Sequence, residues 1–313
     1  MTAFSFDREQ VAHRFFGVAV VILSVCIPTY SRREQVLQTA ALVCDQLPAA
    51  SELVISDNGS TDGTAEAVEA FAAAHPKQAV RLVKHSHNVG FDQNVLDAVL
   101  NARGEFCWLL GDDDIPRRGA LARICSELDT RPDLAHMLLN HARFDAITRT
   151  ITKPRMVAIT ADLVPTTASE FFFHRSPSRS YFQRLGTNII TLSANVVQRR
   201  KWLESAADAS PFIGTNMIHV FVITGMLAAG GATKVIAEPI YEYVCNNHRP
   251  WSNDIWQDYR SNVYGWLRKL GYDANLLGAV ETEEITHRTW RDVAKAVRDS
   301  ILRRSRQQSR NGS

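Results

Sequence analysis

Three adjacent aspartates, Asp112, Asp113 and Asp114, are the residues of this chain best suited to chemistry. They follow directly on an apolar run at residues 106–110 that is typical of a buried strand. Neighbouring carboxylates at such a strand end repel one another and raise each other's pKa values. Mg²⁺ or Mn²⁺, usually held by one or two carboxylates and substrate phosphates, would relieve this repulsion and neutralise a leaving diphosphate. The alternative is a solvated acidic turn that caps the next helix, with Pro116 in its first turn.

Three more polar clusters follow predicted strands. Thr29 and Tyr30 follow the first strand, Asp57 the second, and His87 and Asn88 the third. Ligands of open parallel sheets bind outside the carboxyl ends of the strands, so the four clusters together predict one binding site. A carboxylate at Asp57 can accept hydrogen bonds from a nucleobase, and Tyr30 offers a flat face for stacking. The alternative for Asp57 is an Asx-turn ahead of a capped helix.

The elements that carry these clusters alternate between apolar, β-rich runs and helical patterns. Strands are predicted at residues 20–27, 53–56, 80–84 and 106–110, and helices at 33–46, 64–74 and 91–102. Ser31 is a candidate N-cap of the first of these helices. This alternation predicts an α/β fold, with a Rossmann-like, mostly parallel sheet covered by helices on both faces.

The second half of the chain is less regular. Strands are predicted at residues 135–144, 189–197 and 235–243, a loop or broken helix at 169–184, an apolar helix at 216–229, and helical structure from 251 onward. We therefore expect one domain at residues 1–250, whose halves meet near residue 118, and a helical C-terminal extension with a basic tail at 251–313.

Composition excludes several classes of protein. The 35 Lys and Arg nearly balance the 33 Asp and Glu, which gives no support for nucleic-acid binding. The five cysteines are scattered, as expected of reduced thiols in a cytoplasmic protein. The apolar stretch at residues 15–27 is too short to span a bilayer and is better explained as a buried strand.

The motifs in the first half resemble those of family 2 glycosyltransferases. The similarity rests on SVCIPTYSR at residues 24–32, the segment around Asp57, HNVG at 87–90 with Asn94, and LLGDDD at 109–114. The GDDD variant with its preceding Trp108 is similar to abequosyltransferase-like enzymes of O-antigen synthesis. The resemblance covers residues 20–118 and implies a GT-A fold, a nucleoside-diphosphate sugar donor, a divalent metal and inversion at the anomeric carbon.

The resemblance also implies roles for individual residues. Nucleotide-sugar binding would involve Pro28, Thr29, Tyr30, Arg32, Asp57, Asn88 and Asp112. Tyr30 would stack on the base, which Asp57 would hydrogen-bond. Asp112 would approach the ribose. Asp113 would be the principal metal ligand, and Asp114 would assist through the metal or through bonds to other residues.

The general base does not follow from the resemblance. Many family members carry a G-E-D-like stretch in the second half, whereas the comparable residues 214–216 of this chain are Gly-Thr-Asn, without a carboxylate. A base must reach the acceptor hydroxyl within about 3 Å. Asp208 is favoured and His219 is a rival, although the two would otherwise be a surface aspartate and a core histidine. His248 is a candidate third metal ligand, the alternative being a loop histidine.

The C-terminal segment combines an apolar stripe with positive charge. Residues 288–310 hold eight Lys or Arg and two Asp, and the stripe consists of Trp290, Val293, Ala294, Val297 and Ile301. Either this helix packs on the domain, or it lies peripherally on the anionic inner face of the cell membrane, where a lipid-linked glycan acceptor would be found.

The leading hypothesis is a metal-dependent inverting glycosyltransferase of cell-surface polysaccharide or lipopolysaccharide biosynthesis. A non-catalytic nucleotide-sugar-binding protein is the main alternative. A sugar-phosphate nucleotidyltransferase is disfavoured, because Pro28-Thr29-Tyr30-Ser31 is not the glycine-rich loop that it requires. The sequence does not name the nucleotide, the sugar or the acceptor.

Overall fold

The computed structural model describes residues 22–175, 184–246 and 262–278. The chain divides into two compact units, Met1–Val263 and Tyr264–Ser313. In the second unit, residues 264–269 and 274–278 are helical. The basic segment at 286–310 lies outside the described residues, and no helix within them is long and apolar enough to cross a membrane.

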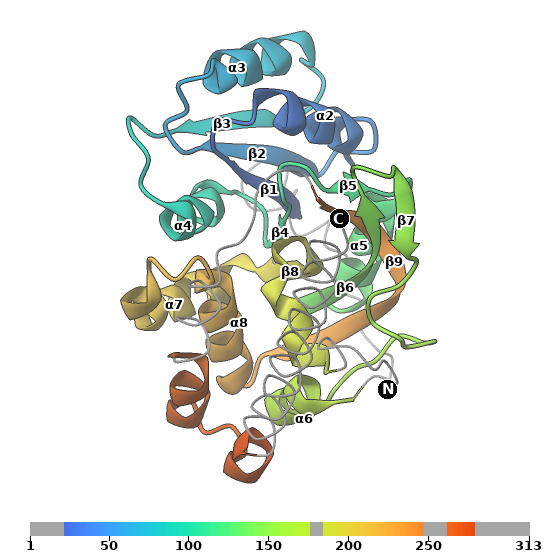
Figure 1. The fold of residues 1–313 in the computed structure, drawn as a ribbon, viewed down its shortest axis with the longest axis vertical. Coiled ribbons are helices and arrows are strands. Elements are labelled where there is room, and N and C mark those ends of the chain that lie inside the picture. Colours follow the sequence, from blue (N-terminus) through green and yellow to red (C-terminus); the bar gives the residue numbers. More distant parts are fainter. Residues whose placement is uncertain (1–21, 176–183, 247–261, 279–313) are drawn as a thin grey trace, which may run out of the picture. The chain divides into compact units, whose positions relative to one another are not determined.

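The first unit is built on a mixed sheet (Figure 1). Its nine described strands are β1 (Leu23–Thr29), β2 (Ser51–Asp57), β3 (Val80–Lys84), β4 (Phe106–Leu109), β5 (Ile115–Pro116), β6 (Leu134–Asp145), β7 (Thr150–Lys153), β8 (Asn195–Gln198) and β9 (Ala232–Cys245). They are ordered β3-β2-β1-β4-β8-β6-β9-β5, with β7 paired to β6. The α-helices are α2 (Arg33–Cys44), α3 (Thr64–Ala74), α4 (Phe91–Asn101), α5 (Ala120–Thr130), α6 (Ala168–Phe173), α7 (Arg199–Ala209) and α8 (Ile218–Ala228).

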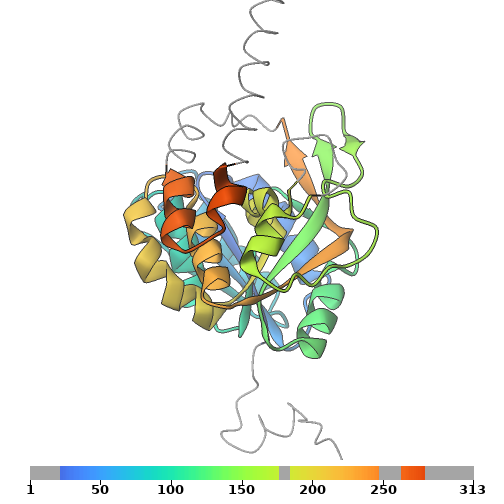
Figure 2. The ribbon, with the colours of Figure 1, turned by 90° about the horizontal axis from the view of Figure 1, so that it is seen from below.

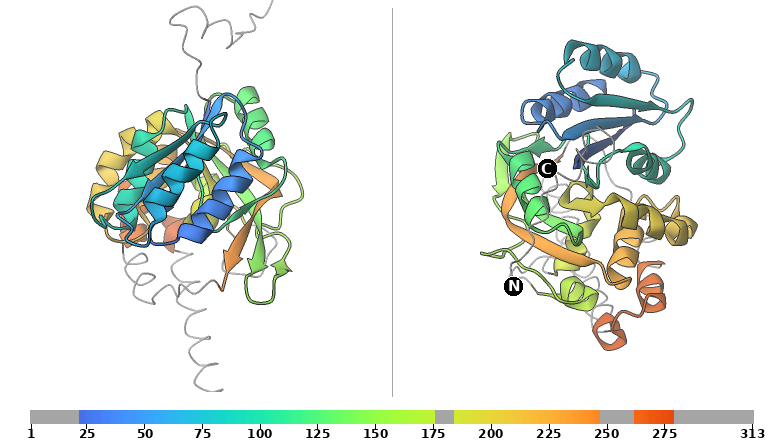
Figure 3. Two further views of the ribbon diagram at one scale, coloured as in Figure 1. Left: turned by 90° about the horizontal axis from the view of Figure 1, so that it is seen from above. Right: turned by 180° about the vertical axis from the view of Figure 1, so that it is seen from behind.

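The first half forms the predicted parallel sheet. β1 pairs in parallel with both β2 and β4, and β2 pairs in parallel with β3. Every residue of β1 and of β2 is buried, because helices cover both faces of these strands. Figures 1 and 3 show α2 and α3 over one face, and α4 on the other. The alternating strands and helices of the sequence thus placed the first four strands correctly.

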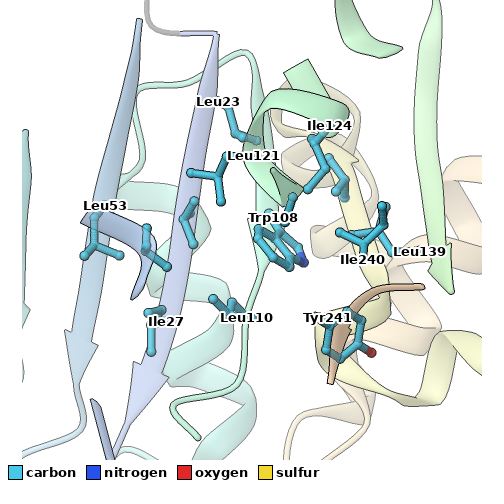
Figure 4. Packing of buried hydrophobic residues seen from close by; sticks show 14 of the residues in the cluster. Leu23, Ile27, Leu53, Trp108, Leu110, Leu121, Ile124, Leu139, Ile240 and Tyr241 are labelled. Carbon is cyan, nitrogen blue, oxygen red and sulfur yellow. The ribbon is translucent and has the colours of Figure 1, made fainter. Parts of the chain in front are cut away.

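The core on the α2 face extends from β1 to β9. Leu23 and Ile27 of β1 pack in one apolar cluster with Leu121 and Ile124 of α5. Figure 4 shows the ring of Trp108 in this cluster, and its edge meets the ring of Tyr241 with centroids 6.3 Å apart. This packing joins β4, immediately before the aspartate cluster, to the second half of the sheet.

The second half adds antiparallel neighbours to the parallel set. β8 is antiparallel to both β4 and β6, whereas β6 and β9 run parallel and lie side by side in Figures 1 and 2. The predicted strands at 135–144 and 235–243 and the helix at 216–229 are confirmed as β6, β9 and α8. The helix α6 covers the start of the segment predicted as a loop or broken helix.

Two local predictions are wrong. Residues 189–197 are extended only from Asn195, after the 3₁₀ turns Leu185–Ile190 and Leu192–Ala194. The Asn195 side-chain amide donates to the carbonyls of Ile189, Thr191 and Leu192 at 2.9–3.1 Å, which holds the chain in turns. Ser31 is not the N-cap of α2. Arg32 holds that position, without a capping hydrogen bond from its side chain, and Ser31 sits at φ 51° with its N–H donating to Ser60.

The alternative interpretation of the three aspartates, an acidic turn that caps the next helix, does not hold either. Pro116 belongs to β5, which pairs with β9, and α5 begins only at Ala120. The aspartate cluster therefore does not cap α5, and its position needs another explanation.

Candidate functional site

A cavity of about 560 Å³ opens at the carboxyl ends of β1 and β4. Its first wall comes from the parallel half and consists of Pro28, Thr29, Tyr30, Arg32, Asn58, Asn88, Gly90, Phe91, Asn94 and Gly111–Asp114. Its second wall comes from the second half and consists of Ile190–Ser193, Asn216, His219, Tyr243 and Val244. The volume falls in the range of small-molecule sites.

Asp112 and Asp113 are held at the cavity by residues that follow β1. Thr29 Oγ1 donates to Asp112 at 2.8 Å, and the Arg32 guanidinium forms ion pairs with Asp112, at 3.3 Å between Nε and Oδ1, and with Asp113. The Thr39 hydroxyl of α2 donates to the backbone carbonyls of Asp112 and Asp114. The turn after β4 is therefore fixed from two sides, and Arg32 pairs with two of its three carboxylates.

Asp114 is buried and is bonded to residues of the second wall. It is 4% exposed, and its carboxylate accepts hydrogen bonds from the Ser193 hydroxyl and from the N–H of Val244 at 2.9 Å. Burial, together with the charge of Asp113, raises the pKa of Asp114 to about 8. Gly111 leaves room for this side chain, because a Cβ at this position would lie 3.1 Å from the Asp114 carboxylate and 3.3 Å from the Ser193 hydroxyl, closer than ordinary contact.

Asn58 and Asn88 join the loops that follow β2 and β3. The Asn58 amide donates to Asn88 Oδ1 at 3.0 Å, while Asn58 Oδ1 accepts from the N–H of Val89 at 2.8 Å. Gly59 allows this approach, since a Cβ there would meet the backbone of His87 at 2.5 Å. The Asn94 amide donates to the carbonyls of Thr29 and Ser56, so it fixes the ends of β1 and β2.

Asp92 connects the first wall to the second. It lies in the first turn of α4, is 2% exposed, and accepts from the N–H groups of Gly214 and Asn216 at 2.8 Å and of Ile218 at 3.1 Å. Burial raises the pKa of the Asp92 carboxyl, and these N–H groups oppose that shift. The side chain thus caps the N-terminus of α8 from another element and holds Asn216 at φ 59° beside the cavity.

His219 is the titratable residue that α8 contributes to the second wall. Its Nε2–H donates to the carbonyl of Ile190 at 2.9 Å, and burial lowers the pKa of its imidazole to about 4. Its ring lies edge-on to that of Phe91, with centroids 6.4 Å apart.

Of the residues predicted from the sequence, Pro28, Thr29, Tyr30, Arg32, Asn88 and Asp112–Asp114 line this cavity together. Asp57 lies next to it but is fully buried, with both carboxylate oxygens accepting from Ser60. Asp208 is exposed on α7 and is not among the residues that line the cavity. His248 lies outside the described residues.

The oxygen atoms at this site suit a divalent cation that is held partly by the protein and partly by a diphosphate. Asp113 reaches the cavity with 18% of its side chain exposed and offers the hard oxygen ligands that Mg²⁺ and Mn²⁺ prefer. Within the described part of the chain no group of three His, Cys, Asp or Glu side chains converges. The fit is therefore to one or two carboxylates plus substrate oxygens, with Asp114 supporting the turn from behind.

Two functional features were not predicted from the sequence. Asp92 carries no motif that distinguishes it from any acidic residue in a first helical turn. Ser193 lies in the segment wrongly predicted as a strand. Its hydroxyl accepts a hydrogen bond from the N–H of Gly111 and donates one to Asp114. The one sequence signal for the second wall is that the apolar run at residues 189–197 contains Thr191 and Ser193.

Comparison with known proteins identifies relatives of this chain. The sequence profile described as "Glycosyl transferase family 2" matches residues 24–205. "Abequosyltransferase RfbV" of Salmonella typhimurium is 29% identical over 227 residues, which are 70% of this chain and 66% of that protein. "Dolichyl-phosphate beta-glucosyltransferase" of Dictyostelium discoideum is 30% identical over 101 residues, 30% of this chain and 31% of its own length. The chain thus spans just under two thirds of the first relative and about a third of the second.

Solved structures share the fold. Residues 1–349 of S. aureus TarS, in complex with UDP, superpose with a TM-score of 0.55 at 15% identity, over 80% of this chain and 64% of that fragment. The mannosyltransferase PcManGT from Pyrobaculum calidifontis, in complex with GDP-Man and Mn²⁺, superposes with a TM-score of 0.52 at 19% identity, over 79% of this chain and 63% of that chain. These likenesses identify the fold as GT-A.

Proposed function

Because this chain belongs to glycosyl transferase family 2, we propose that it transfers a sugar from a nucleoside-diphosphate sugar to an acceptor hydroxyl, with inversion at the anomeric carbon. The observation that carries this proposal is the cavity between its two walls. The ends of β1 and β4 bring Thr29, Arg32 and the aspartate cluster to one side, and α8 brings Asn216 and His219 to the other. This arrangement suits a diphosphate on the first wall and an acceptor on the second.

Asp113 would hold Mg²⁺ or Mn²⁺ in this reaction. The bound cation would supply charge neutralisation for the leaving diphosphate. Arg32 and Thr29 hold Asp112, which would approach the ribose, and Arg32 also pairs with Asp113. Tyr30 would stack on the base.

A thermal-shift screen tests the proposed donor class. Uridine, cytidine, guanosine and thymidine diphosphates are added with Mn²⁺ or Mg²⁺, and the melting temperature is measured. A true ligand stabilises the fold by about 2.7 kcal/mol at a hundredfold excess over its dissociation constant. A melting temperature that no nucleoside diphosphate raises would contradict the proposal.

Asp57→Ala is expected to weaken binding of the matching nucleoside diphosphate by about tenfold to a hundredfold, because a buried acceptor for the base is removed. Calorimetry measures the affinity. Asp62→Ala is the matched control, since Asp62 holds the same loop through Thr64 but lies further from β1. Equal affinities in wild type and Asp57→Ala would leave Asp57 only its bonds to Ser60.

We place the acceptor in cell-surface glycan synthesis of the O-antigen or lipopolysaccharide type, as a polysaccharide or lipid-linked glycan. The similarity to a protein named as an abequosyltransferase supports this assignment. The enzyme would act in the cytoplasm, peripherally on the inner face of the membrane, through the basic segment at residues 286–302.

Membrane binding should require anionic lipid and weaken as salt rises, since each basic residue near such a surface contributes about 1 kcal/mol. Co-sedimentation with vesicles of anionic or zwitterionic lipid measures it. Replacing Arg288, Arg291, Lys295 and Arg298 by Gln should abolish the anionic preference. Full-length protein that stays in solution with anionic vesicles at low salt would contradict this part of the proposal.

A non-catalytic nucleotide-sugar-binding protein is the second candidate, because the described second wall contributes no carboxylate. Metal-dependent release of nucleoside diphosphate from a bound sugar donor separates the two functions. A binding protein would show the thermal shift without the release.

A further inference from the structure

His219 carries a buried nitrogen that the fold leaves unused. The carbonyl oxygen of Ile190 can only accept, so the proton of the neutral ring resides on Nε2. Nδ1 then carries the lone pair, and it is buried without a hydrogen-bond partner among the described residues. Leaving such a buried acceptor unpaired is unfavourable. A ligand hydroxyl in the cavity would remove that cost.

The other groups that could take a proton in this cavity are already engaged. Among the described lining residues, the carboxylates are those of Asp112, Asp113 and Asp114. The first two pair with Arg32, and Asp114 accepts from Ser193 and Val244. All three belong to the first wall, which the diphosphate would occupy.

We propose that Nδ1 of His219 is the general base that accepts the proton of the acceptor hydroxyl. This inference rests on the proposed glycosyl transfer. The hydroxyl oxygen forms a bond to the anomeric carbon, the bond from that carbon to the diphosphate oxygen breaks, and the nucleoside diphosphate leaves with the electron pair. The hydroxyl proton moves to Nδ1 and passes to solvent after the product departs.

The surroundings of His219 favour this step. Because burial lowers its pKa to about 4, the imidazole is neutral near pH 7 and its lone pair is available. Its basicity is then close to that of an ordinary carboxylate. The Ile190 carbonyl fixes the ring and its tautomer, as the partner of a catalytic histidine commonly does.

The test uses two variants of the full-length chain. His219→Gln can keep the bond to Ile190 through its amide but has no nitrogen at Nδ1, and His219→Ala opens a space for an added base. The donor is the nucleoside-diphosphate sugar whose nucleotide gives the largest thermal shift. The rate measured is that of donor hydrolysis, in which water takes the place of the acceptor hydroxyl and nucleoside diphosphate is released. Both variants should bind the nucleotide with wild-type affinity and lose about 10²- to 10⁴-fold in rate.

Added imidazole should restore part of the rate of His219→Ala, whereas pyrazole, which has the same shape and is a much weaker base, should not. His136→Gln is the matched control, since both nitrogens of that buried histidine are paired, with Thr233 and Asn195, outside the cavity. It should retain the wild-type rate.

Two outcomes would overturn the assignment of the base: a wild-type rate in His219→Gln, or equal rescue by imidazole and pyrazole. If the protein still binds the nucleotide in these experiments, the proposed function stands. A wild-type chain that binds no nucleoside diphosphate overturns both.

Discussion

Asp113→Asn is expected to lower the rate of sugar transfer by about 10³-fold, equivalent to about 4 kcal/mol of transition-state stabilisation. The variant keeps the shape of the side chain and removes the charge that would hold a divalent cation against the leaving diphosphate. The Asn side chain keeps the size of Asp113 and can still accept from Arg32, so we expect the melting temperature to change less than the rate. Steady-state release of nucleoside diphosphate at saturating Mn²⁺ measures the loss.

Asp208→Asn is the matched control for this variant. The side chain of Asp208 is exposed on α7 and does not line the cavity, so its loss of charge should leave the rate within about twofold. A large loss in Asp208→Asn would restore that residue as a candidate base. Full activity of Asp113→Asn, or of wild type in excess EDTA, would remove the metal from the proposed mechanism.

The first wall could be predicted from the sequence because its chemistry is local. Thr29, Asn88 and Asp112 each lie at or after the end of a predicted strand, and parallel strands bring their carboxyl ends to one edge. The position of each cluster then follows from the order of strands, without knowledge of any long-range contact. The same reasoning assigned β3 and α3 their observed bounds.

The second wall could not be predicted in this way. Residues 189–197 are apolar, and burial alone does not distinguish a strand from turns that a side chain stabilises. The three hydrogen bonds of the Asn195 amide favour turns over a strand here. The spacing of apolar residues in the sequence gives no sign of these bonds. His219 likewise sits in a uniformly buried helix, where its contact with Ile190 gives it a defined tautomer.

Asp92→Ala is expected to lower the free energy of unfolding by about 3 kcal/mol, because three buried N–H groups lose a charged acceptor at once. The carboxylate accepts from Gly214, Asn216 and Ile218, which are the residues that lead into α8. Asp92→Asn keeps one acceptor oxygen and should lose about 1–2 kcal/mol. Urea unfolding followed by circular dichroism gives both values.

Asp97→Ala is the control on the same helix. Its carboxylate pairs with the side chains of Gln93 and His85, is 18% exposed, and satisfies no N–H group of α8, so we expect a loss below about 1 kcal/mol. The Asp92 variants should also slow transfer more than they weaken nucleotide binding. The reason is that Asn216 and His219, on the second wall, depend on the segment that Asp92 holds, while the first wall keeps its own bonds. Equal stability of Asp92→Ala and wild type would mean that the backbone of residues 214–218 holds its conformation without this carboxylate.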